Sequence, residues 1–219
     1  MNTQRLFILA LCCATAGALG TAVRADSTHS GDDTDIAHFK IYGGAAYVAP
    51  MSDSEVTWNS FTEAVKAEKH IGWNLGFEGR FNRWFGVELD YVDANQDVRF
   101  GGTTIGDTNF SPLTATFNIH LVHSRIVDFY VGPSYSYVNW GDIHLNTTGR
   151  TFPEFTGSSD IGTDSSHGWG VSLGLDIGLG KHFAIAGGLK YLNVSLEPKG
   201  YSSIAVNPLV GRLGVAFRF

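Results

Sequence analysis

Histidine and serine are the residues of this chain whose types could do covalent chemistry, because a serine hydroxyl activated by a histidine is a nucleophile. His167 follows Ser165 and Ser166, and His123 precedes Ser124. Neighbouring side chains on a strand point to opposite faces, so adjacent residues make a poor dyad. We therefore expect no catalytic residue and no enzyme activity.

The remaining histidines do not form a metal site either. His120 has no serine in register, and His38, His70, His144 and His182 fall at strand ends or in loops. No pair has the spacing of metal ligands. We expect every histidine to be a polar residue of an interface or a loop, and we expect no metal and no cofactor.

Charged side chains are the second set that could interact, through ion pairs. Only 16% of the residues are charged, against about 25% in average proteins. Some of the charges, of both signs, lie at alternating positions within apolar stretches. They are Lys40, Glu78, Arg80, Glu88, Asp90, Asp176, Lys190, Arg212 and Arg218. If these stretches enclose a common interior, the charges neutralise one another and serve a structural role, and losing one partner would leave a buried charge.

The stretches that carry these charges have the period of β-strands. Between 169 and 179, large apolar residues occupy every second position, and Gly, Ser and Asp lie between them. This alternation indicates a strand with one apolar and one polar face. The same pattern recurs over 39–47, 71–81, 85–91, 113–121, 129–137, 183–191 and 209–219.

The connections between the expected strands alternate in length. Those at 82–83, 123–127 and 180–181 are short, whereas those at 49–68, 94–109 and 141–164 are long, and a fourth around Pro198 is intermediate. A soluble sandwich is the alternative, but its strands usually have about 5–6 residues, and these are about twice as long, as a tilted strand needs to cross lipid. We expect an all-β fold, an eight-stranded antiparallel up-and-down transmembrane barrel with short periplasmic turns and long extracellular loops.

The first 25 residues have the pattern of a secretory signal peptide. Arg5 precedes an apolar run over 6–19, and Val23-Arg24-Ala25 resembles a cleavage site. The run is too short for a membrane anchor, which needs about 20 residues. We therefore expect 1–25 to be removed and 26–219 to form a single barrel domain. Both cysteines, Cys12 and Cys13, would leave with the peptide, which excludes disulfides and thiolate sites.

Charge and aromatic residues indicate the partners of this domain. The net charge of the whole chain is -6, which argues against nucleic acid as a partner. Aromatic residues gather near the ends of the expected strands, as in barrels with two interfacial girdles. The outer group is Tyr47, Tyr91, Tyr137 and Tyr191, and the inner group is Phe39, Phe81, Phe85, Phe129, Phe183 and Phe219. Export and outer-membrane insertion follow, with lipid and lipopolysaccharide as partners and the insertion machinery recognising Phe219.

Several short motifs occur in a fixed order along 36–219. They are Ala49-Pro50, Phe85-Gly86-Val87-Glu88-Leu89, Pro112-Leu113-Thr114-Ala115, Tyr130-Val131-Gly132-Pro133, Trp169-Gly170, Gly174-Leu175-Asp176, Lys190-Tyr191-Leu192-Asn193-Val194, Asn207-Pro208-Leu209-Val210 and Phe217-Arg218-Phe219. In order and spacing the chain resembles the OmpW family of small bacterial outer-membrane proteins, which often has Asp where Asn193 and Asn207 stand. The resemblance implies periplasmic termini, passage of small apolar molecules with a sideways exit to lipid, and receptor or stress roles.

The polar face of the strands changes character in their outer halves. There the positions that alternate into the lumen include Val92, Trp140, Leu192 and Val194. An apolar concavity suits a small apolar ligand, and a packed plug at the mouth of a small barrel is the alternative reading. We take these four residues as the ligand site of a passive pathway for small apolar solutes.

A structural or receptor role through the extracellular loops is the other functional alternative, because binding residues concentrate on loops. Ser60 and Glu63 fit a capping box, so the first loop could form a short helix, a mobile loop or an extension of the strands. The loop around Pro153 could fold over the mouth of the barrel.

Overall fold

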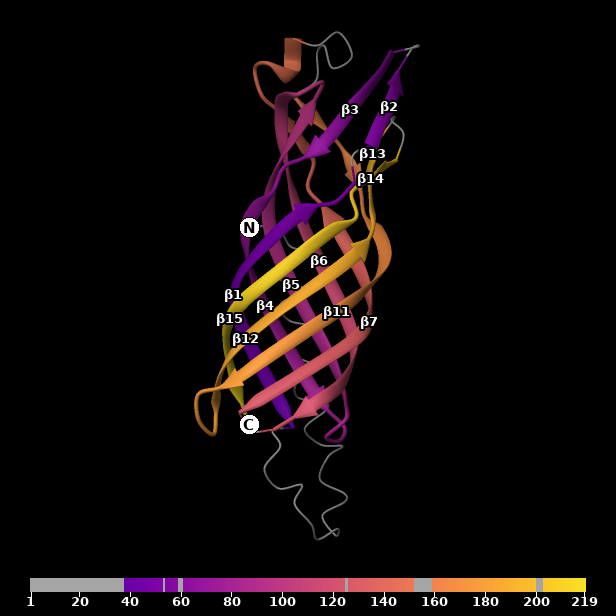
Figure 1. The fold of residues 1–219 in the computed structure, drawn as a ribbon. Helices are drawn as coiled ribbons and strands as arrows, with labels where there is room; N and C mark the ends of the chain where they lie inside the picture. Colours follow the sequence, from indigo (N-terminus) through magenta and orange to yellow (C-terminus); the bar gives the residue numbers. More distant parts are fainter. Residues whose placement is uncertain (1–37, 53, 59–60, 125, 152–158, 200–202) are drawn as a thin grey trace.

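Eight long antiparallel strands close into a barrel, which confirms the expected fold (Figure 1). The computed structural model describes residues 38–219 apart from 53, 59–60, 125, 152–158 and 200–202. The expected signal peptide, 1–25, therefore lies outside the described residues. The barrel strands are β1 (Phe39–Pro50), β4 (His70–Arg80), β5 (Phe85–Phe100), β6 (Thr103–His123), β7 (Val127–Trp140), β11 (Ser166–Gly178), β12 (Phe183–Asn193) and β15 (Pro208–Arg218).

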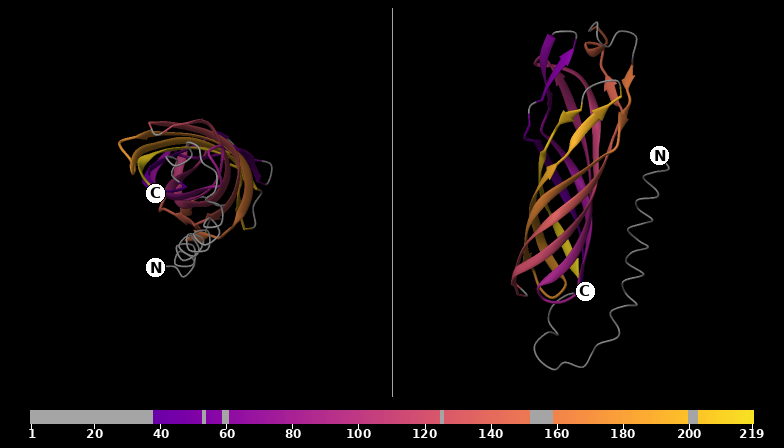
Figure 2. Two further views of the ribbon diagram at one scale, coloured as in Figure 1. Left: turned by 90° about the horizontal axis from the view of Figure 1, so that it is seen from below. Right: turned by 90° about the vertical axis from the view of Figure 1, so that its right-hand side faces the viewer.

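The first and last barrel strands pair with each other and close the ring. Viewed along its axis, the strands enclose a common interior (Figure 2). The register sets Lys40 of β1 opposite Arg218 of β15 and Glu78 of β4. Phe39 and Phe219 exchange two backbone hydrogen bonds of 3.0 Å at the end of this seam. No helix of the described chain is long and apolar enough to cross a membrane.

One end of the barrel, here called the inner end, carries the C-terminus and the short turns (Figure 1). In the first turn, the Asn82 side chain accepts hydrogen bonds from the backbone N–H of Trp84 and Phe85, at 2.8 and 3.0 Å. This is an Asx turn, which reverses the chain in few residues. In the last turn, Gly180 adopts a φ of 138°, which favours glycine.

The opposite, outer end carries the short elements (Figures 1 and 2). They are β2 (Ser54–Trp58), β3 (Phe61–Ala67), β8 (Ile143–Leu145), β9 (Asp160–Ile161), β10 (Thr163–Asp164), β13 (Ser195–Pro198), β14 (Ile204–Ala205) and the 3-10 turn η3 (Gly149–Thr151). The first connection extends the sheet, because β3 pairs with β2 and β5. Of the three alternatives for the first loop, the extension of the strands is therefore confirmed for 61–67, and the capping-box helix is wrong there. The segment around Pro153 lies outside the described residues.

The expected loop over 94–109 is wrong. β5 and β6 continue through it and meet at Gly101 and Gly102, whose positive φ values of 56° and 83° make a tight turn. This segment resembles a loop in sequence because the environment outside the barrel changes there from lipid to water. Below this segment the outward residues of β5 are apolar, such as Leu89, whereas within it they are polar, such as Asn95. The hairpin therefore projects from lipid into water while its alternation continues.

The outer surface of the barrel below that level is apolar. Along β11, the exposed residues Trp169, Val171, Leu173 and Leu175 alternate with buried Ser172 and Asp176. Large exposed aromatic residues lie near both ends of the strands, such as Tyr47 and Tyr137 at the outer end and Phe81, Phe85, Phe183 and Phe219 at the inner end. This is the surface of a barrel that spans a lipid layer.

Candidate functional site

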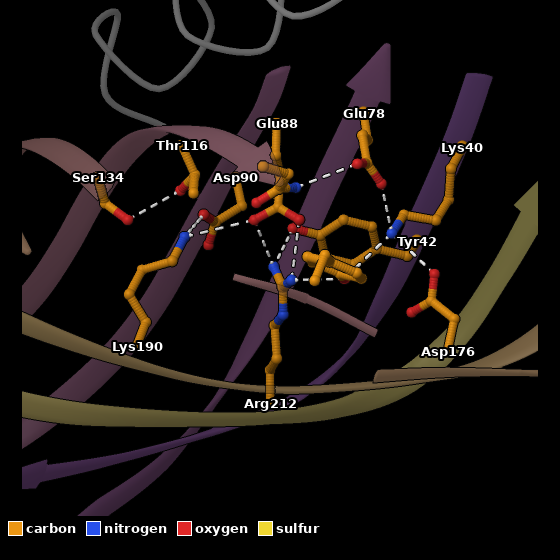
Figure 3. Close-up of polar contacts among 12 residues, drawn as sticks. Lys40, Tyr42, Glu78, Glu88, Asp90, Thr116, Ser134, Asp176, Lys190 and Arg212 are labelled. Atoms are coloured by element: carbon orange, nitrogen blue, oxygen red, sulfur yellow. Dashed lines mark hydrogen bonds and ion pairs between the residues drawn. The ribbon is translucent and has the colours of Figure 1, made fainter. Parts of the chain in front are cut away.

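The inner half of the lumen is filled by a network of buried charges (Figure 3). The structure places all nine charged residues predicted for the lumen inside the barrel, where none of their side chains is more than 7% exposed. Eight of them are joined by the ion pairs described below. Such burial stabilises a fold only when each charge keeps its partners.

Lys40 lies at one centre of the network. Its ammonium is 2.6 Å from Glu78 Oε2 and 2.8 Å from Asp176 Oδ2, and it donates to the Tyr130 hydroxyl at 3.1 Å. These partners come from β4, β11 and β7. One side chain of β1 thus connects three other strands across the interior.

Arg212 and Glu88 form the second centre. The guanidinium of Arg212 donates to both carboxylate oxygens of Glu88, at 2.9 and 2.8 Å, and also to the hydroxyls of Tyr42 and Tyr130. Lys190 pairs with Asp90 and is 3.5 Å from Glu88. The two-pronged Arg–Glu contact is the strongest ion-pair geometry available to these residues.

The sequence reasoning missed two members of the network. Asp128 pairs with Arg80, and His120 bridges Asp128 and Glu78 with its two ring nitrogens, at 2.8 Å each. The expectation that every histidine is an interfacial or loop residue is wrong for His120, whose ring is 0% exposed. Its position on the polar face of the expected strand 113–121 could have identified it as a lumen residue. Asp128 fell between the expected turn at 123–127 and the expected strand at 129–137, yet it is the acid that balances the five lumen bases with five lumen acids.

Two buried tyrosines also belong to the interior, and the sequence reasoning named neither as a member of the network. Tyr42 and Tyr130 lie on the inward positions of β1 and β7, and their rings stand over glycines of neighbouring strands. A Cβ at Gly76 would lie 2.2 Å from Tyr42, and one at Gly174 would lie 2.1 Å from Tyr130. The glycines of the polar faces therefore make room for lumen side chains. The network and its tyrosines occupy the inner half of the lumen.

An apolar cluster fills the lumen beyond the charges, toward the outer end. The structure brings the four predicted ligand residues, Val92, Trp140, Leu192 and Val194, together in it, each no more than 5% exposed. The Trp140 indole donates to Ser166 Oγ at 2.9 Å and to the Ser195 carbonyl at 3.1 Å. We call this the outer apolar cluster, and its other members are Ala46, Val48, Ala94, Val98, Ile105, Phe110, Val138, Ile143, Leu145, Ile161, Leu196, Ile204, Val206 and Val210.

Part of the outer apolar cluster was missed because 94–109 was assigned to a loop and 110–112 to no strand. Phe110, which is 0% exposed and lies 5.0 Å from Trp140 between ring centroids, packs beside the predicted residues. Val98 and Ile105 come from the hairpin itself. A cavity of about 10 Å³ remains beside Trp140, which is room for about one water molecule.

The backbone ladder between β5 and β6 skips two positions at the level where the lumen changes from charged to apolar. Tyr91 pairs with Leu113 and Ala94 pairs with Phe110, but no ladder pair joins Val92 to Pro112. Proline has no backbone N–H to donate. We call this stretch, residues 91–94 of β5 and 110–113 of β6, the β5–β6 seam. On its outer face, the Asn109 side chain donates to Asp93 Oδ1 at 2.7 Å.

Asn207 secures another irregular part of the wall. It adopts a φ of 41°, accepts from the Val194 backbone N–H at 3.2 Å and donates to Ser52 Oγ at 2.9 Å. An amide can do both, whereas an ionised carboxylate can only accept. The Asn at this position therefore ties the end of β12 to the segment after β1.

At the outer rim, His144 of β8 lies opposite Asp160 of β9 and bonds to its carboxylate. That hydrogen bond raises the pKa of His144 above its ordinary value, and hydrogen bonds from Ser159 and then His144 lower the pKa of Asp160. The contact is therefore strongest between the ordinary values of about 3.9 for Asp and about 6.5 for His. It is lost above the raised pKa of His144 and below the lowered pKa of Asp160.

We expect Asp160→Asn to lower the midpoint of the His144 titration, because the amide offers the imidazolium no charge. An NMR pH titration of the His144 ring in the two proteins measures the shift. An unchanged His144 midpoint in Asp160→Asn contradicts the pairing.

Comparison with known proteins decides the family. The family model for the outer membrane protein beta-barrel domain matches residues 9–219. The chain belongs to this family. It is thus a bacterial outer-membrane barrel, as the sequence predicted. No curated protein sequence matches the chain.

Solved outer-membrane proteins share the fold. OprG from Pseudomonas aeruginosa is 21% identical with a TM-score of 0.73, over 84% of this chain and 97% of that one. AlkL is 12% identical with a TM-score of 0.59, over 89% and 96%. Outer Membrane Protein W from E. coli is 18% identical with a TM-score of 0.50, over 85% and 100%. The chain therefore shares the barrel fold of these outer-membrane proteins, as the resemblance to the OmpW family implied.

Proposed function

We propose that this outer-membrane barrel captures small apolar molecules at its outer end and releases them sideways into the lipid. The observation that carries the proposal is the change of the lumen from a balanced charge network to the outer apolar cluster at the level of the β5–β6 seam. An apolar solute that enters from outside meets Val92 and Phe110, which lie beside this seam.

The charge network supports a sideways rather than a straight route. To continue through the barrel, an apolar solute would have to separate pairs such as Lys40–Glu78 and Arg212–Glu88. Separating a buried pair costs several kcal/mol per uncompensated ion. Because the β5–β6 ladder skips the pair at Pro112, the wall at this level is held by fewer backbone hydrogen bonds than elsewhere along the same two strands.

We propose no catalytic role for this barrel. Both ring nitrogens of His120 are bound by carboxylates, so this buried histidine has no nitrogen left to activate a nucleophile. We propose lipid and lipopolysaccharide as the partners of the outer surface and recognition of Phe219 by the insertion machinery. The exposure of Phe219, at 52%, supports the last proposal.

Uptake of a small apolar fluorescent probe tests the proposed route. We compare cells with an intact outer membrane that lack the protein, contain it, or contain Leu192→Asp. A charge within the outer apolar cluster is costly to bury and repels an apolar solute, so protein-dependent uptake should fall at least about tenfold. Met51→Asp, at an exposed position of the outer end, is the matched control and should retain uptake.

Delivery of folded barrel to the membrane is checked by its migration on gels with and without heating. If Leu192→Asp does not fold, Leu192→Asn introduces a milder polarity at the same place. Equal uptake in all strains would contradict the route. The projecting β2–β3 and β5–β6 hairpins would then favour the second candidate, a structural or receptor role at the outer surface.

A further inference from the structure

Gln96 is a polar residue inside the outer half of the barrel that the sequence reasoning did not single out. It lies on an inward position of β5, opposite Thr108 of β6, and is 0% exposed. Neither its amide nitrogen nor its amide oxygen has a hydrogen-bond partner among the described residues. Leaving a buried amide unsatisfied destabilises a fold, so this position calls for an explanation.

The neighbouring hydroxyls do not satisfy the amide. Thr108 Oγ1 donates to the Gly141 carbonyl at 2.7 Å, and Ser52 Oγ accepts from Asn207. Gln96, Thr108 and Ser52 nevertheless all line the same cavity of about 10 Å³ as Trp140 and Ile204. The unsatisfied amide therefore lines a small space whose other walls are mainly apolar.

We propose that Gln96 is the hydrogen-bonding anchor of the solute site and selects small, mostly apolar molecules that carry one hydroxyl or carbonyl oxygen. The inference rests on the proposed function and names its substrate class. A primary amide both donates and accepts, so it serves an alcohol or a ketone. No lysine or arginine is among the described residues that line the cavity, so the site offers no cation to a carboxylate.

The wall formed by β13 and β14 is the part of the cavity that can yield to a solute larger than water. Leu196 of β13 and Ile204 of β14 line the cavity, and the two strands share only two ladder pairs. β13 is joined to β10 by two more. Segments with few backbone hydrogen bonds open locally at low cost. The solute chain would then lie along Trp140, with its oxygen at Gln96.

Titration of the isotope-labelled full-length barrel in lipid nanodiscs tests the proposal. The probes are 1-hexanol and hexane, which have the same chain and differ by one hydroxyl. The readouts are the NMR signals of the Gln96 side-chain amide and the Trp140 indole. We expect hexanol to shift both signals and to bind about three- to tenfold more tightly than hexane, the effect of one neutral hydrogen bond.

Gln96→Met has nearly the same volume and removes the amide, so it should abolish the preference for hexanol while hexane still shifts Trp140. Asn95→Leu removes the neighbouring amide on the exposed face of β5 and should leave the preference unchanged. Equal affinities for both probes in the wild type, or a preference that survives Gln96→Met, overturn the role of Gln96. If neither probe shifts Trp140, the proposed solute site itself fails.

Discussion

Replacing Arg212 with alanine is expected to lower the free energy of unfolding by about 3–5 kcal/mol, the usual cost of removing one partner of a buried ion pair. The guanidinium makes two bonds to Glu88 and bonds to Tyr42 and Tyr130. Its loss leaves the carboxylate of Glu88, which is 0% exposed, with Lys190 at 3.5 Å as its remaining ion-pair partner among the described residues. Glu88→Ala should lower the free energy of unfolding by a similar amount, because it leaves the buried guanidinium of Arg212 without its carboxylate partner.

Urea unfolding in detergent micelles, followed by tryptophan fluorescence, measures both changes. Arg99→Ala is the matched control, since Arg99 pairs with Glu68 at 2.6 Å but both side chains are about 40% exposed. Exposed pairs contribute about 0–1 kcal/mol. Unchanged stability in Arg212→Ala and Glu88→Ala would falsify the structural role of the network.

The double variant Arg212→Met/Glu88→Leu separates the two costs that the single variants combine. Replacing both partners by apolar residues of similar volume removes both charges, so neither is left buried without its partner. Proteins in which a buried ion pair is replaced in this way often lose little stability. We therefore expect the double variant to be more stable than either alanine variant. If its stability equals that of Arg212→Ala, packing around the guanidinium, rather than the uncompensated charge, is the cause.

The alternation of strands was predictable because the barrel meets a different environment on each face. In β11, Ser172 and Asp176 face the lumen while Val171 and Leu175 face outward, so the period of two is plain from sequence. The same parity placed the nine lumen charges and the four apolar ligand candidates inside. What parity cannot give is the partner of each charge, because partners such as Lys40 and Asp176 are 136 residues apart.

The segment 94–109 was not predicted as strand because its outer face is polar and its inner face is apolar, the reverse of the pattern in the rest of the barrel. Its alternation continues in phase with the rest of β5, but polar Asn95 and Asp97 now face outward and Ala94 and Val98 face inward. Water replaces lipid as the outer solvent, so the polarity of the two faces inverts. A stretch rich in Gly, Asn and Asp with inverted faces resembles a loop, and Gln96 was overlooked with it.

A disulfide across the β5–β6 seam is expected to abolish sideways release. The flanking pairs Tyr91–Leu113 and Ala94–Phe110 set Asp93 opposite Ser111. Opposed residues in antiparallel strands have Cα atoms about 4.5–5.5 Å apart, which a disulfide can join. Because Cys12 and Cys13 are the chain's two cysteines and lie in the expected signal peptide, Asp93→Cys/Ser111→Cys introduces one defined cross-link.

Oxidation of this double variant should reduce protein-dependent probe uptake to the level of cells without the protein, and a reductant should restore it. Trp169→Cys/Asn193→Cys, a register pair between β11 and β12, is the matched control and should retain uptake when oxidised. The single cysteine variants control for loss of the Asp93–Asn109 bond. Full uptake through a barrel whose β5–β6 cross-link is complete by mass spectrometry would place the exit elsewhere. In the proposed route, the buried charges below the seam exclude an apolar solute, and the lipid beside it accepts one.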